Sequence, residues 1–208
     1  MTRRKIWLSA CLALAASPAF ADATYHSLQG GDFLQDWSNA ALITANDDWS
    51  GVPSIIGYRG DGLAGSAGVD PQTILAIDSV VDVNANQTNP VTFTTGGVTE
   101  FALANPVVAV AGSGTARAPS IVIHLNTTNR YNLTAEYTLR DLDTGTDNSV
   151  QQVALQYRIG NTGNFTNIPG GYVADASAGP SMTLDTPMVV SLPAAVDNQP
   201  QVQLRILT

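Results

Sequence analysis

A strict alternation of apolar and polar residues is the feature that most limits how this chain can fold. Between Tyr131 and Arg140, every second residue is apolar and the residues between them are polar. Successive side chains of a strand point to opposite sides, so a period of two is typical of a strand with one buried face. The alternation recurs in Val153–Ile159 and Val202–Ile206. It predicts a protein built from half-buried strands.

Further short runs of β-branched and aromatic residues are separated by clusters of Gly, Asn, Asp and Thr, for example at 143–148 and 160–164, where we expect turns. No segment shows a sustained apolar period of 3.6 residues, and one helical turn is expected at Pro71–Ile77. This pattern predicts an all-β fold, a two-sheet antiparallel sandwich of jelly-roll type. The expected strands are Asp32–Trp37, Ala40–Thr44, Ser54–Tyr58, Thr92–Thr94, Thr99–Leu103, Val107–Ala111, Ser120–Leu125, Tyr131–Arg140, Val150–Ile159, Tyr172–Ala174, Met188–Leu192 and Gln201–Leu207.

Residues 1–21 have the layout of a secretory signal peptide. A cationic start at 3–5 is followed by an apolar run and by the small-residue triplet Ala19-Phe20-Ala21. The run is too short for a helix that spans a bilayer of about 30 Å. We therefore expect cleavage before Asp22, no membrane anchor, and secretion into the periplasm or medium of a bacterium. Two alternatives stay open: a lipoprotein box ending at Cys11, and a twin-arginine export signal.

The segment 22–208 is expected to form one β-sandwich module. It has no lysine and no cysteine, and its six arginines stand against 17 acidic residues, which gives a net charge of −11. A field of that sign repels phosphate backbones and anionic membranes, so we expect no direct nucleic-acid binding. Without cysteines the fold depends on its core and not on disulfides. The last alternating strand stops at Thr208, and we expect it to leave an exposed sheet edge, as a module truncated at its last strand would. The alternative is a genuine terminal strand that is tied into a sheet.

Two loops are rich in oxygen ligands, which calcium prefers. The candidate ligands are Asp47 and Asp48 in an early turn, and Asp141, Asp143 and Asp147 in a later one. The later cluster has part of the spacing of an EF-hand but lacks its closing glutamate. The alternative is that these carboxylates only decorate solvated turns. No other cofactor is expected.

Catalytic side chains are scarce. The two histidines are His26, near the expected cleavage site, and His124, which lies inside an expected strand and is more typical of a core or strand-edge position than of a ligand. No spacing indicates a Ser-His-Asp arrangement or a phosphate-binding loop. Trp49 is the best candidate for stacking on a sugar ring, although core packing is favoured for it.

Several blocks carry a resemblance to a known type of module: Asn46–Gly62 (NDDWSGVPSIIGYRGDG), Val81–Gln87, Val150–Gly160 and Asn164–Tyr172. Together they resemble the N-terminal module of large secreted bacterial proteins. Such proteins commonly carry extracellular nuclease, endonuclease/exonuclease/phosphatase or metallophosphoesterase domains downstream. The resemblance covers 22–208 and assigns no catalytic role to any residue here.

Three functions follow from these patterns. The first is a noncatalytic structural or adhesive module of a secreted multidomain protein, whose partners are polysaccharide or downstream domains of the same chain. The second is the N-terminal fragment of a secreted, metal-dependent nuclease or phosphatase whose catalytic domain lies beyond residue 208. The third is a carbohydrate-binding module that acts through Trp49.

Overall fold

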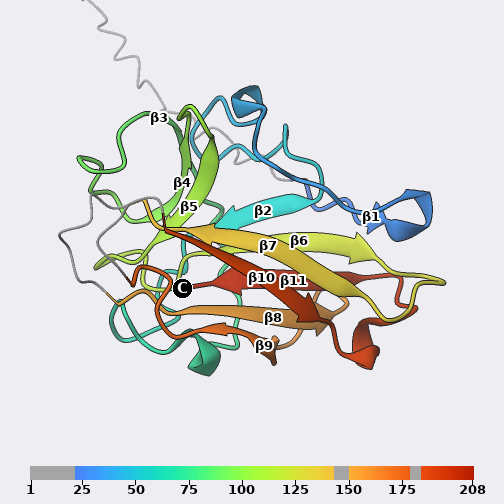
Figure 1. Ribbon diagram of the computed structural model, residues 1–208. Coiled ribbons are helices and arrows are strands. Elements are labelled where there is room, and N and C mark those ends of the chain that lie inside the picture. The colour runs from blue at the N-terminus through green and yellow to red at the C-terminus, as the bar shows by residue number, and fades with distance from the viewer. Residues whose placement is uncertain (1–21, 143–149, 179–183) are drawn as a thin grey trace, which may run out of the picture.

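The computed structural model describes residues 22–142, 150–178 and 184–208. Regular structure in these ranges consists of strands and short 3-10 helices (Figure 1). The strands are β1 (His26–Ser27), β2 (Ile55–Tyr58), β3 (Asn84–Gln87), β4 (Gly97–Phe101), β5 (Val107–Ala111), β6 (Ser120–Asn126), β7 (Thr134–Arg140), β8 (Val153–Ile159), β9 (Thr166–Val173), β10 (Asp185–Ser191) and β11 (Val202–Leu207). The 3-10 helices are η1 (Leu28–Gly30), η2 (Ala40–Leu42), η3 (Pro71–Thr73) and η4 (Ala194–Val196). The expected all-β sandwich is confirmed.

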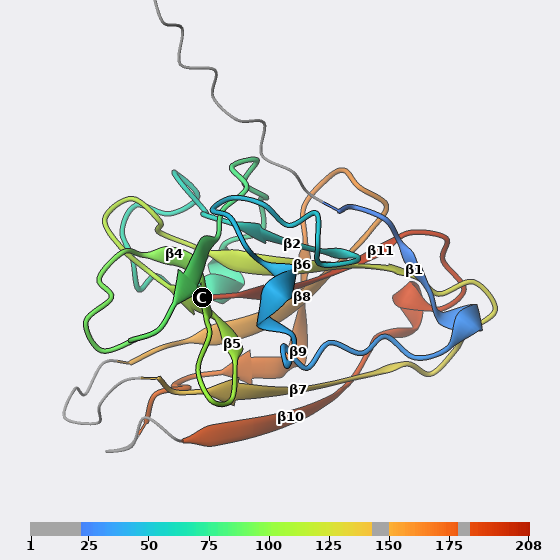
Figure 2. The ribbon, with the colours of Figure 1, turned by 90° about the horizontal axis from the view of Figure 1, so that it is seen from above.

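The largest sheet has the order β1-β6-β11-β8-β9, and β2 pairs with β6 beside this path. We call it the main sheet. A two-stranded sheet, β7 with β10, and a three-stranded sheet, β3-β4-β5, complete the fold. Figure 2 shows β7 and β10 as a layer apart from β6, β11 and β8. Two short pairings, β1 with β6 and β3 with β4, are parallel, and all other strand pairings are antiparallel.

Two apolar clusters hold these layers together. One joins β2 and β6 to β3, β4 and β5, with Trp49, Val83 and Val98 fully buried at its centre. The other joins β8 and β11 to β7 and β10, through residues such as Leu155 and Leu204. Each buried side chain of this size stabilises the fold by about 1.5–3 kcal/mol. The alternating apolar residues of the sequence therefore form the inner faces of the sandwich.

Most expected strands are present, but three are not. Asp32–Trp37 and Thr92–Thr94 form no strand, and Ala40–Thr44 contains η2 instead. At Trp37 the backbone takes a φ of 59°, a left-handed conformation that ends an extended run. Strand β3 and most of β9 were not expected. The expected helical turn is present as η3, which covers only the first three residues of Pro71–Ile77. It has proline at its start, and the Asp70 side chain accepts a hydrogen bond from Gln72 N.

The C-terminal strand is central, not peripheral. β11 pairs with β6 on one side and with β8 on the other. The expectation of an exposed edge at this strand was therefore wrong, because β11 inserts between two strands that precede it in the chain. Within the described residues, no helix has the length and apolar character needed to cross a membrane.

The second face of the main sheet is polar and still buried. Gln156 and Arg158 of β8, and Gln203 and Arg205 of β11, are each 5% exposed or less. The segment around η3 supplies main-chain acceptors to Gln156 and Arg205: Arg205 donates to Ala76 O at 2.5 Å and to Ile74 O at 2.6 Å.

Phe165 closes this cover. The guanidinium groups of Arg158 and Arg205 lie 4.6 and 4.0 Å from the centre of its ring, within the range of cation–π attraction. Arg205 also donates to Gln156 Oε1. Burial lowers the pKa of Arg205 to about 9. Carbonyls and a ring thus take the place of a carboxylate partner for this cation among the described residues.

Candidate functional site: a polar groove beside Asp82

Three cavities lined by described residues are candidate sites. The first is only about 10 Å³ and lies between the 37–43 segment and β4 and β5. The second, about 470 Å³, lies between β5 and β7 and is lined mainly by Val, Ala, Thr and Leu. The third, about 510 Å³, combines carboxylates, amides, hydroxyls and a guanidinium. Its size falls in the range of ligand pockets, about 300–1,000 Å³, and we call it the Asp82 groove.

Five segments of the chain meet at the Asp82 groove. One side is formed by the turn at 46–47, by Arg59 after β2, and by Asp82 and Asn84 at the start of β3. The other is formed by the loops 94–96 and 113–116, which enter β4 and leave β5. The polar residues of the lining are Asn46, Asp47, Arg59, Asp82, Asn84, Thr94, Thr95, Ser113 and Thr115.

Three hydrogen bonds attach the turn at 46–47 to the chain at 83–85. Asp47 N donates to Val83 O at 2.9 Å, and Val83 N donates back to Asp47 Oδ1 at 3.2 Å. Ala85 N donates to Asn46 Oδ1 at 2.9 Å. Asp47 has a φ of 60°, which Asp and Asn adopt more readily than other side chains. An Asn-Asp pair at this turn is thus a local requirement as well as a source of groove polarity.

Asp82 is the most buried charged residue of the groove, at 7% exposed. Its Oδ2 accepts a 2.6 Å bond from Val98 N, and its carbonyl accepts one from the Trp49 indole at 3.0 Å. A glycine at 97 permits this approach, since a Cβ there would lie 2.2 Å from Asp82 Oδ2 and the φ is 113°. Burial raises the pKa of the Asp82 carboxyl above its usual range, and the bond from Val98 opposes the shift.

Arg59 brings the one guanidinium of the lining. Its Nε and Nη2 donate to Asp61 at 2.5–3.0 Å, a bidentate pair. This pairing raises the pKa of Arg59. The remaining nitrogen, Nη1, donates to no acceptor within the described residues, so it stays available for a ligand.

Several side-chain atoms of the groove have no partner among the described residues. Asp82 uses only Oδ2, Asp47 uses only Oδ1, and Asn84 uses only Nδ2, which donates to Val98 O and Thr99 Oγ1. Three acceptor oxygens on neighbouring elements are therefore left for a ligand: Asp82 Oδ1, Asp47 Oδ2 and Asn84 Oδ1. The groove can accept hydrogen bonds from several donors at once.

The calcium candidates are separated in space. Asp47 lines the groove, whereas Asp48 turns back to accept a bond from Ser50 N at 2.9 Å, and its hydrogen bonds with Ser50 lower its pKa. Asp141 is buried beside the second cavity, and Asp143 and Asp147 lie outside the described residues. In the described ranges, no three His, Cys, Asp or Glu side chains are placed to hold one metal ion.

Trp49 does not offer a face to a sugar. It is fully buried, and its ring packs edge-on against Trp37 at 6.4 Å and close beneath Gly57. The hypothesis of glycan stacking on Trp49 is therefore wrong, and the favoured core position is confirmed. His124 is also in the core, 3% exposed, with Nδ1 3.4 Å from Ser54 O. Burial lowers its pKa.

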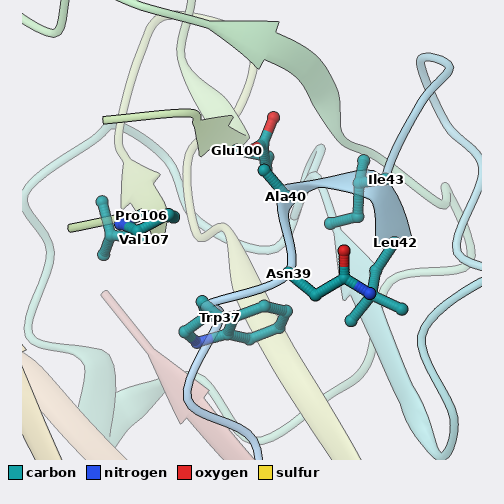
Figure 3. A pocket seen from close by; sticks show the side chains of 8 residues that line it. All are labelled: Trp37, Asn39, Ala40, Leu42, Ile43, Glu100, Pro106 and Val107. Atoms are coloured by element: carbon teal, nitrogen blue, oxygen red, sulfur yellow. The ribbon is translucent and has the colours of Figure 1, made fainter. Parts of the chain in front are cut away.

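The smallest cavity lies beside Glu100 of β4, opposite Trp37 and Asn39 (Figure 3). Glu100 is 4% exposed, and its Oε2 accepts a 2.7 Å bond from Asn86 N. Its Oε1 has no partner among the described residues, and burial raises the pKa of this carboxyl. The cavity is too small for anything larger than one water molecule. We therefore treat Glu100 as a strained core residue and not as a ligand site.

Arg59, Asp82 and Asn84 were not among the candidates from the sequence. Asp82 and Asn84 belong to an alternating run, Val81–Ala85, whose polar positions indicate only a strand face. Their partner Asp47 is 35 or more positions away, and no local pattern joins the two segments. The early Asp-rich turn was a candidate from the sequence, and its Asp47 lines the groove.

Comparison with known proteins adds no relative. No family model, no curated protein and no solved structure matches this chain.

Proposed function

We propose that this chain is a noncatalytic adhesive β-sandwich module of a secreted bacterial multidomain protein, and that it binds polysaccharide in the Asp82 groove. The observation that carries the proposal is the groove itself. The carboxylate of Asp82, which is more than nine-tenths buried, and the guanidinium of Arg59, whose Nη1 has no partner among the described residues, lie in one groove of about 510 Å³ with amides and hydroxyls. Sugar hydroxyls both donate and accept hydrogen bonds, so a lining of mixed donors and acceptors suits them.

The resemblance supports the setting. The blocks 46–62 and 81–87, which resemble the N-terminal module of secreted bacterial nucleases and phosphatases, are the segments that supply Asp47, Arg59, Asp82 and Asn84. In such a protein the module would hold the polymer or a neighbouring domain while a downstream domain performs chemistry. Sequencing the gene beyond codon 208 tests this setting, and an open reading frame without a further domain would contradict it.

Binding of the purified 22–208 segment to a panel of soluble polysaccharides tests the function. We expect Asp47→Ala and Asn84→Ala each to weaken binding about tenfold, which corresponds to about 1.4 kcal/mol. The matched control is Asp48→Ala, since this neighbouring carboxylate bonds to its own turn. The absence of binding to every polysaccharide, or equal losses for the Asp47 and Asp48 variants, would contradict the proposal.

A further inference from the structure

The groove and its border carry more negative than positive charge among the described residues. Asp47, Asp61 and Asp82 surround Arg59, whose guanidinium is already paired with Asp61. Arg59 lowers the pKa of Asp82, but Asp47 and Asp61 oppose it and raise that pKa. A buried carboxylate in such a field gains free energy from any cation that enters the groove.

We infer that the Asp82 groove recognises a protonated primary amine on a sugar, so that the polysaccharide bound is an amino-sugar polymer. This inference rests on the proposed function and names its ligand class. An ammonium group has three donors, and the groove presents three acceptor oxygens without partners among the described residues: Asp82 Oδ1, Asp47 Oδ2 and Asn84 Oδ1.

A divalent cation fits the same oxygens less well. Calcium takes about six to eight oxygen ligands, mostly carboxylates and carbonyls. The lining offers two carboxylates, at Asp47 and Asp82, and places the Arg59 guanidinium beside them. Doubling the charge of the ion doubles its attraction to these carboxylates as well as its repulsion from Arg59, so the small number of anionic oxygen ligands is what disfavours calcium.

The walls favour a sugar over the lysine side chain of a protein. A lysine reaches a carboxylate through four methylene groups, which bind best along apolar surface. Here the loops opposite Asp82 present Thr94, Thr95, Ser113 and Thr115. Their hydroxyls, with Arg59 Nη1 and Asn46 Nδ2, match the hydroxyl groups that flank the amine of an amino sugar.

The test compares a glucosamine tetramer with an N-acetylglucosamine tetramer by calorimetry at pH 6, where a primary amine is protonated. We expect the free-amine tetramer to bind the 22–208 segment at least tenfold more tightly. Asp82→Asn should reduce this preference to less than threefold while binding of the acetylated tetramer persists. Asp48→Asn, the matched control, should keep the full preference. If Asp82→Asn does not fold, Asp47→Asn is read in its place.

The outcomes separate the inference from the function on which it rests. Equal binding of both tetramers, unaffected by Asp82→Asn, overturns the amine inference and leaves polysaccharide binding intact. Displacement of the free-amine tetramer by 1:1 calcium assigns the groove to a metal ion and also overturns it. If neither tetramer nor any polysaccharide of the panel binds, both fail.

Discussion

Strand β7 lies in a two-stranded sheet with one face in water, whereas β11 lies in the centre of a sheet that is covered on both faces. Both strands alternate apolar and polar residues. On β7 the polar residues Thr134, Glu136 and Thr138 are exposed. On β11 the polar residues Gln203 and Arg205 are buried. Alternation therefore identifies the apolar face of a strand, which packs in the core. It does not show whether another part of the chain covers the polar face.

The cover over β11 is made by irregular chain. The segment around η3 and the ring of Phe165 lie on the polar face and bind it through carbonyl oxygens and the ring. Each buried donor that finds an acceptor avoids a penalty of about 1–3 kcal/mol. The polar face thus fixes the position of the 59–80 segment, whose first residue, Arg59, lines the groove.

The largest expected effect comes from Arg205→Met. The substitution leaves the carbonyls of Ile74 and Ala76 and the amide oxygen of Gln156 without their donor. We expect a loss of about 4 kcal/mol in the free energy of unfolding, measured by urea denaturation. Arg140→Met on β7 is the matched control and should cost less than about 1 kcal/mol, because Arg140 makes one exposed bond to another described residue. Equal losses would break the comparison.

Phe165→Leu tests the ring beneath the two guanidinium groups. Leucine keeps an apolar filler but removes the attraction at 4.0 and 4.6 Å. A loss of about 2 kcal/mol is expected from the same unfolding measurement. Tyr131→Leu, at an aromatic residue that is 58% exposed, should change the free energy by no more than about 0.5 kcal/mol. A neutral Phe165→Leu would mean that packing alone holds the cover.

The chain has two glutamates, and they can be compared directly because Glu100 on β4 is buried and Glu136 on β7 is exposed. Burial raises the pKa of Glu100, so its protonated form favours the folded state: the stabilising effect is complete below the unfolded pKa and is lost as the pH rises through the folded value. We expect Glu100→Gln to stabilise the protein by about 1 kcal/mol at pH 7. The gain should disappear near pH 4. Glu136→Gln on exposed β7 should have no such pH dependence, and a similar curve for both would contradict the assignment.

Structural calcium remains a proposal, and its expected effect on stability is of the same order as that of Glu100→Gln. At ten times its dissociation constant, a bound ion stabilises the folded state by about 1.4 kcal/mol. For a domain of this size the melting midpoint should rise by about 3–5 °C. Asp143→Ala should abolish the rise if the later Asp cluster is the site, and Asp36→Ala, an exposed carboxylate, should not. A midpoint that chelator and calcium leave unchanged would end the proposal.

The sequence predicted the apolar half of this molecule better than the polar half. The strands at 107–111, 120–126 and 202–207 were expected almost to the residue, because β-branched runs and period-two alternation are local signals. The burial of Arg205 was not, since its cover lies about 130 positions away. Asp47 was a candidate ligand and Asp82 was not, because only the fold brings the two side chains to one groove. The sequence left Trp49 between a core position and a sugar-stacking role, and the arrangement of the layers places it in the core.

The central claim is that this module holds an amino-sugar polymer in the Asp82 groove and leaves its bonds intact. Mass spectrometry of glucosamine oligomers recovered from the bound complex tests it most directly. The account predicts that the wild-type segment retains the oligomers, that Asp82→Asn retains fewer of them, and that they are recovered at their original lengths. Recovery of shortened oligomers, or equal retention by the variant, would contradict it.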